Sequence, residues 1–298
     1  MSPSLVTSNL AAYACLRCVV AAIVSVIPVA STVTSEADGQ EHFLVVRIDA
    51  RNAGLPSSEI ALRIGNISVP VMALKTSPDV RRNIAIVIDA GPDQAQVLPR
   101  EKELAVALVD DLSDARTSFT VARAGVSSKT QATTDDRFVA IEHIRDIAGE
   151  IGEKTKVPIY DAIGSAIRQI SLSPGLRVLI FIGEGNDGGS RLRYAELRGL
   201  AESNQVAFFA ALIADHTPRG ARSILRYGWN LQDLTSDTAG IFLENPSTQK
   251  ATRHLSENIR NLILISFDTR SLRSGRHKVV VLAHGNKRLR AQRVVIIP

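Results

Sequence analysis

The sequence predicts an α/β fold: a doubly wound, mostly parallel β-sheet with helices on both faces, flanked by short β segments. Two apolar runs, Ile84 to Ile88 and Val178 to Ile182, contain no polar residue, which is typical of strands buried on both faces. From Asn83 onward, strand and helix patterns alternate, as they do where helices connect parallel strands. With 298 residues and 45% apolar content, the chain can bury a full core.

The alternation can be followed along the chain. Leu104, Ala105, Leu108 and Leu112 share one face of a helix predicted over residues 99–112. Two extended segments, 117–124 and 126–133, follow and are expected to pair antiparallel. Further helices are predicted at 135–150, 159–170, 191–204, 223–235 and 247–261, and further strands at 205–214, 241–243 and 262–267.

Short strand candidates flank this region. Three precede it, and the pair 60–64 and 67–74 is joined by Gly65-Asn66, which predicts a hairpin. The third is 43–49, and the tail adds 278–282 and 293–297. The predicted organisation is a signal peptide over 1–31, a polar linker and small β module over 32–80, the α/β domain over 81–265, and a C-terminal β segment over 266–298.

The N-terminus has the pattern of a secretory signal peptide. Cys18 to Ala30 is an uncharged run of 13 residues that follows Arg17, too short for a comfortable membrane span. The two cysteines, Cys15 and Cys18, both lie in this leader. We therefore expect a secreted or periplasmic chain with no transmembrane span after leader removal. The alternative is a chain anchored in the membrane by an uncleaved leader.

The charge is modest for a protein of this length, because the net excess is +5. This balance does not indicate a nucleic-acid partner. The most concentrated charge is a C-terminal basic cluster, which is typical of solvated faces of half-buried strands. Its alternative interpretation is contact with an anionic envelope surface such as lipid headgroups or acidic glycans. The cluster comprises Arg270, Arg273, Arg276, Lys278, Lys287, Arg288, Arg290 and Arg293.

Four stretches, in order along the chain, carry a resemblance to a known family. They are Ile-Val-Ile-Asp-Ala-Gly-Pro-Asp at 86–93, Val-Pro-Ile-Tyr-Asp-Ala-Ile at 157–163, Val-Leu-Ile-Phe-Ile-Gly-Glu-Gly at 178–185 and Leu-Thr-Ser-Asp-Thr-Ala-Gly at 234–240. Together they resemble the von Willebrand factor type A domain, as in exported bacterial proteins where this domain follows a short β segment. The resemblance covers most of the mature chain and implies the α/β fold described above.

The resemblance also implies where a functional site would lie. The family's metal-ion-dependent adhesion site uses an Asp-x-Ser-x-Ser loop, a Thr on a second loop and an Asp on a third, which hold Mg²⁺ through oxygen atoms. The corresponding positions here are Asp89, Gly91, Asp93, Val157 and Glu184. Only Asp89 is the residue type that the family has at its position. Because Gly91 and Val157 have no side-chain oxygen, we expect binding without a metal cofactor.

Two interpretations of the remaining carboxylates stay open. Asp89, Asp93 and Glu184 could gather around Mg²⁺ or Ca²⁺ in a cation-dependent adhesion site. Alternatively, the two aspartates make turn and helix-start hydrogen bonds while Glu184 points into water. In both cases the carboxyl ends of the strands are expected to form an interaction rim that includes Gly91, Val157 and Asp187.

A nucleotide-binding enzyme is the less favoured alternative. Gly183 to Gly188 matches G-x-G-x-x-G after a strand, but Glu184 and Asp187 place negative charge where a pyrophosphate would lie. The six histidines are scattered, and no serine lies in a G-x-S-x-G motif, so hydrolase chemistry is not indicated.

We therefore expect a non-enzymatic function. The chain is predicted to be an exported protein-interaction or adhesion module, with a protein partner at the envelope or outside the cell and no nucleic-acid partner.

Overall fold

The computed structural model describes residues 42–47, 56–150, 156–214, 218–283 and 287–297, all within one compact unit. The predicted signal peptide and most of the predicted polar linker lie outside the described residues. In the described part of the chain, no helix has the length and apolar character needed to cross a membrane.

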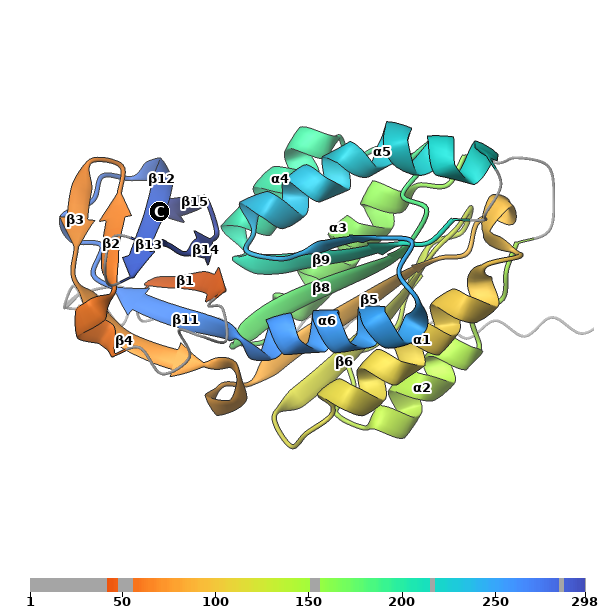
Figure 1. Ribbon diagram of the computed structural model, residues 1–298, viewed down its shortest axis with the longest axis horizontal. Helices are drawn as coiled ribbons and strands as arrows, with labels where there is room; N and C mark the ends of the chain where they lie inside the picture. The colour runs from red at the N-terminus through yellow and green to blue at the C-terminus, as the bar shows by residue number, and fades with distance from the viewer. Residues whose placement is uncertain (1–41, 48–55, 151–155, 215–217, 284–286, 298) are drawn as a thin grey trace, which may run out of the picture. The chain divides into compact units, whose positions relative to one another are not determined.

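A six-stranded, mostly parallel sheet forms the centre of the α/β region (Figure 1). Its middle strand, β5 (Arg82–Asp89), is buried along its whole length because it pairs with parallel neighbours on both sides. Only the short edge strand β7 runs antiparallel. The strand order is β10 (Phe242–Glu244), β9 (Val206–Leu212), β8 (Leu176–Gly183), β5, β6 (Thr117–Ala124) and β7 (Lys129–Thr130).

Helices cover both faces of this sheet, as Figure 1 shows. Alternate residues of β5 supply the two cores: Ile84, Ile86 and Ile88 face one layer, whereas Ala85 and Val87 face the other. The first layer contains α1 (Leu98–Leu112), α2 (Arg137–Arg145) and α6 (Thr248–Arg260), and the second contains α3 (Ile159–Ile170), α4 (Tyr194–Ser203) and α5 (Pro218–Asp237).

The flanking strands form a β module with its own core, which includes Leu44, Ile265 and Phe267. One antiparallel sheet has the order β14 (Arg290–Ala291), β1 (His42–Arg47), β11 (Leu262–Phe267) and β4 (Val71–Thr76). The other has the order β13 (Lys287–Arg288), β12 (Gly275–Ala283), β2 (Ala61–Ile64) and β3 (Ile67–Val69), with β15 (Val294–Ile297) paired to β12.

The predicted fold class is confirmed, and several element bounds differ, such as the strand expected over 126–133, which is only Lys129–Thr130. The strand expected over 67–74 is two strands separated at Pro70, whose missing N–H interrupts a ladder. The helix expected over 135–150 ends at Arg145. The strand at 262–267 pairs with β1 and β4 instead of joining the parallel sheet, so the boundary predicted at residue 265 falls inside β11.

Candidate functional site

The expected interaction rim lies where β5 and β8 end. Asp89 is the last residue of β5, and Gly183 ends the neighbouring parallel strand β8. The loops after these strands and the segment before α3 enclose a cavity of about 240 Å³. The cavity is lined by Asp89, Gly91, Pro92, Asp93, Gln94, Lys156, Val157, Glu184, Asn186 and Gly188. The structure thus brings together Asp89, Gly91, Asp93, Val157 and Glu184 at one cavity, as the resemblance implied.

Glycine at positions 91 and 183 permits this close packing. A Cβ atom on Gly91 would lie 2.5 Å from Val157 Cγ2, so the valine methyl fills the space that a side chain at position 91 would need. Gly183 has a φ of +153°, and a Cβ there would lie 2.2 Å from the Cβ of Asp89. Gly91 and Val157 are therefore complementary in shape, and neither has a side chain that could ligate a metal ion.

Asp89 is almost fully buried, with 3% of its surface exposed. Burial, together with the nearby Glu184 carboxylate, raises the pKa of its carboxyl group to about 7. Hydrogen bonds from backbone N–H groups act in the opposite direction, among them Gly91 N–H to Asp89 Oδ1 at 3.2 Å. The donors do not offset the burial, so the protonated form persists to near neutral pH.

Glu101 is a fourth carboxyl group, which interacts with Asp89 and Glu184 beside the cavity, and it was not among the residues predicted from the sequence. It lies on α1 with none of its surface exposed, and neither carboxyl oxygen has a hydrogen-bond partner among the described residues. Burial raises its pKa well above the usual range, followed by repulsion from Asp89 and Glu184. The available signal was spacing: Glu101 lies three residues before Leu104, on the apolar face of the predicted helix.

Glu184 is partly buried and does not simply point into water. Gln94 Nε2 donates to Glu184 Oε2 at 2.9 Å, which connects the loop after β5 to the loop after β8. Asp93 is exposed at the start of the short 3₁₀ turn Pro92–Gln94. The two loops are therefore held together by a side-chain amide at this point.

Asp187, predicted as part of the rim, stabilises the start of α3. The helix begins after Pro158, which provides no side-chain cap. Asp187 Oδ1 accepts a hydrogen bond from the backbone N–H of Tyr160 at 3.1 Å, and Ser190 Oγ accepts one from Asp161 N–H at 3.1 Å. In return, Asp161 accepts from the N–H groups of Arg191 and Leu192. This exchange fixes the loop after β8 against the helix.

The residues present do not fit the octahedral Mg²⁺ site of the family. Gly91 and Val157 supply no side-chain oxygen, and they pack against each other. Among the residues with described positions, no group of three or more His, Cys, Asp or Glu side chains could hold a metal ion.

The Gly183 to Gly188 loop also differs from a dinucleotide fingerprint. Helix α4 begins at Tyr194, several residues after the third glycine, so the loop does not open a helix. The amide of Gly188 donates to the carbonyl of Val157 at 3.1 Å, and that of Asp187 donates to the carbonyl of Gly185. These two amides are thus already used within the protein.

The basic cluster is distributed over several ion pairs. Arg270 pairs with Asp268, Arg276 with Glu202, and Arg293 with Asp237. Lys278, Arg290 and Arg293 line a second and larger cavity.

Comparison with known proteins gives likenesses of fold. No protein-family model matches the chain, and no curated protein matches it. An aerotolerance-related membrane protein from Bacteroides fragilis matches with 16% identity over 59% of this chain and 98% of its own, at a TM-score of 0.46. The conserved hypothetical protein BatB from Bacteroides thetaiotaomicron matches with 21% identity over 59% of this chain and 96% of its own, at a TM-score of 0.44. A von Willebrand factor type A structure from Catenulispora acidiphila matches with 11% identity over 86% of this chain and 72% of its own, at a TM-score of 0.49.

The α/β region has a von Willebrand factor type A-like fold. The chain's own architecture shows this fold: a mostly parallel sheet with one antiparallel edge strand, helices on both faces, and Asp89 at the carboxyl end of the central strand.

Proposed function

We propose that the chain is an exported protein-interaction module that binds a protein partner through the rim at the carboxyl ends of β5 and β8, without a metal ion. The observation that carries this proposal is the contact between Gly91 and Val157. At the positions where the family places two metal ligands, this chain has a glycine and an apolar side chain that fills the glycine's space.

The construction of the rim supports a binding role. Its loops are joined by Gln94 to Glu184 and by Asp187 to the start of α3. Loops fixed on a rigid scaffold lose less conformational entropy when a partner binds. Exposed side chains, including Asp93 and Lys156, border the cavity and supply polar contacts.

The raised pKa values support metal-free binding. Asp89 and Glu101 favour their protonated forms because they are buried and repel each other and Glu184. Protonation relieves this repulsion without a cation.

Export is the second component of the proposal, and it rests on the leader pattern. The mature chain is secreted or periplasmic, or is held at the membrane by an uncleaved leader.

Site-specific photo-crosslinking in the cells that produce the protein tests the partner. A benzoylphenylalanine at Asp93, on the rim, is expected to give a discrete protein adduct that persists in EDTA. The control is the same residue at Arg253, an exposed position on α6. Equal adducts from both positions, or none from the rim, would overturn the proposal. An adduct lost in EDTA and restored by Mg²⁺ or Ca²⁺ would replace it with the cation-dependent alternative.

A further inference from the structure

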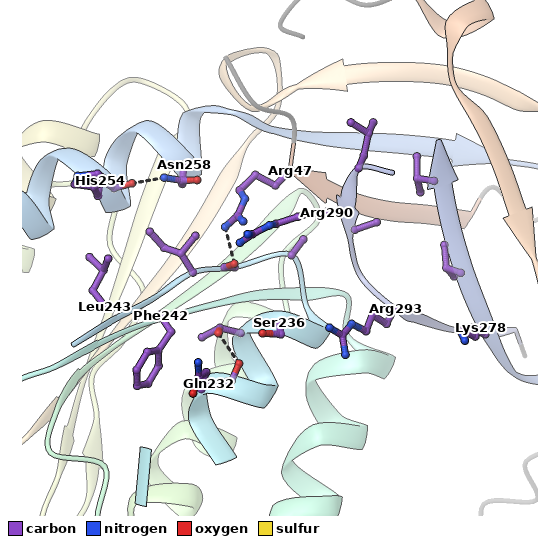
Figure 2. Close-up of a pocket in the computed structure, with 18 residues that line it drawn as sticks. Arg47, Gln232, Ser236, Phe242, Leu243, His254, Asn258, Lys278, Arg290 and Arg293 are labelled. Carbon is purple, nitrogen blue, oxygen red and sulfur yellow. Dashed lines mark hydrogen bonds between the residues drawn. The ribbon is translucent and has the colours of Figure 1, made fainter. Parts of the chain in front are cut away.

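A second cavity, of about 1120 Å³, lies beside the other end of the α/β region and is shown in Figure 2. Its walls come from the C-terminal part of α5, from β10 and α6, and from β12 and β14 of the β module. The charged side chains that line it are basic: Arg47, Lys278, Arg290 and Arg293, with His254 beside them. No aspartate or glutamate lines it within the described ranges.

This cavity borders an open strand edge. β10 is the last strand of the six-stranded sheet and pairs only with β9 among the described strands. Ile241 O accepts from Ala210 N–H, and Asn245 N–H donates to Leu212 O, so these two residues face β9. Backbone groups alternate in direction along a strand, and Phe242 and Glu244 therefore present their N–H and C=O groups on the open side. Gly240, Ile241, Phe242 and Leu243 line the cavity.

One end of the cavity is closed where the segment between α5 and β10 contacts the β module. Thr238 and Gln292 form an isolated antiparallel bridge. Arg47 Nη1 donates to the carbonyl of Gly240 at 2.6 Å, a contact drawn in Figure 2. Beyond these contacts, residues of β10 and of β14 line the same cavity. Strand β14 is also at the edge of its sheet.

The positive charge at this space is only partly balanced. Arg293 pairs with Asp237 at 3.0 Å. Lys278 and Arg290 are exposed, and neither has a carboxylate partner among the described residues. Arg47 and Arg290 are direct cross-strand neighbours on β1 and β14. An anionic group in the cavity would be attracted to the exposed side chains of Lys278 and Arg290.

We propose that this cleft binds an extended acidic segment of a partner protein, which adds to β10 as a further strand and places its carboxylates near Arg290 and Lys278. Main-chain hydrogen bonds to Phe242 and Glu244 supply affinity in such strand addition, and side-chain contacts supply specificity. The apolar side chains of Leu243 and Leu289, which also line the cavity, suit the residues that alternate with the carboxylates. A small anion would use the charges but not the strand edge.

Fluorescence anisotropy with a labelled Glu-Val-Glu-Val-Glu-Val peptide tests this proposal. Binding is expected for this peptide and not for Lys-Val-Lys-Val-Lys-Val. Arg290→Glu is expected to weaken binding by about 10-fold or more, and Lys278→Glu to do the same. Because both side chains are exposed, we expect each variant to fold, and thermal unfolding of the variants checks this.

A pair of variants at Glu244 separates strand addition from simple charge attraction. Glu244→Pro removes an edge N–H that the sheet itself does not use, and is expected to abolish binding. Glu244→Ala keeps the N–H and is expected to bind at least as well as the wild type. Equal binding by the two variants, equal binding of the basic peptide, or no binding of the acidic peptide would overturn the proposal. Asp89→Ala leaves this binding unchanged, which separates it from the rim.

Discussion

Asp89 shows how the site differs from a set of metal ligands. It keeps its place at the end of β5, but burial raises its pKa to about 7. Glu101 is fully buried on α1, and its pKa is raised by burial and by repulsion from the Asp89 and Glu184 carboxylates. A cluster of this kind stores unfavourable free energy when it ionises.

This charge cluster makes stability depend on pH. The folded-state pKa of Asp89 is above its ordinary value of 3.8, so the unfolded state loses its proton first and stability falls as pH rises. The fall runs from about pH 4 to about pH 7 and then levels off. Between pH 5 and pH 8, Asp89 is expected to cost about 3 kcal/mol of unfolding free energy. Urea unfolding of wild type and Asp89→Asn at both pH values measures this difference. An unchanged pH dependence in the variant would contradict the assignment.

The Gly91 and Val157 contact gives a second prediction. Gly91→Ala places a methyl group against Val157 Cγ2 and is expected to cost about 1 to 3 kcal/mol. In a Val157→Ala background this cost falls by at least about 1 kcal/mol, because the opposing methyl is gone. Gly199→Ala is the control, since a Cβ there meets no atom within 4 Å. Additive effects in the double-mutant cycle would contradict the packing.

Helix α3 depends on a cap from another loop. Asp187→Ala removes the acceptor for Tyr160 N–H and is expected to lower the unfolding free energy by about 1 to 2 kcal/mol. Glu142→Ala, at an exposed position on α2, is the control and should change it by less than about 0.5 kcal/mol. Equal effects of the two substitutions, measured by urea unfolding, would show that Asp187 does not cap the helix.

The sequence allowed the elements to be predicted better than their partners. Uninterrupted apolar runs identified β5 and β8 because strands covered on both faces need apolar residues at every position. The pairing of β11 with β1 was not predictable, since a strand pattern does not specify which distant strand it joins. The same limit applies to Asp187, whose bonding partner lies 27 residues away. Glu101 was predictable in principle from its place on the apolar face of α1.

Glu202 links the α/β region to the β module. Its carboxylate, 2% exposed, accepts from Arg198 on α4 at 3.1 Å and from Arg276 on β12 at 2.7 and 3.0 Å. Its carbonyl oxygen accepts from Gln292 Nε2 at 2.9 Å. This one residue therefore connects three segments that are distant in sequence.

Removal of this carboxylate is expected to destabilise the fold. Glu202→Ala should lower the unfolding free energy by about 2 to 3 kcal/mol, less than for a fully buried pair because both arginines are partly exposed. Arg270→Ala, which removes an exposed pair with Asp268, should leave the denaturation midpoint unchanged. A Glu202→Ala midpoint equal to that of the wild type would contradict the linking role.

Binding at the rim is proposed to need no metal ion. Calorimetric titration of the mature chain with Mg²⁺, Mn²⁺ and Ca²⁺, beside the Asp89→Ala variant, tests this proposal. We predict no saturable heat from either protein, because Gly91 and Val157 provide no ligand and Asp89 is buried. Saturable binding by the wild type that the variant loses would contradict the proposal and restore a cation site at Asp89, Asp93 and Glu184.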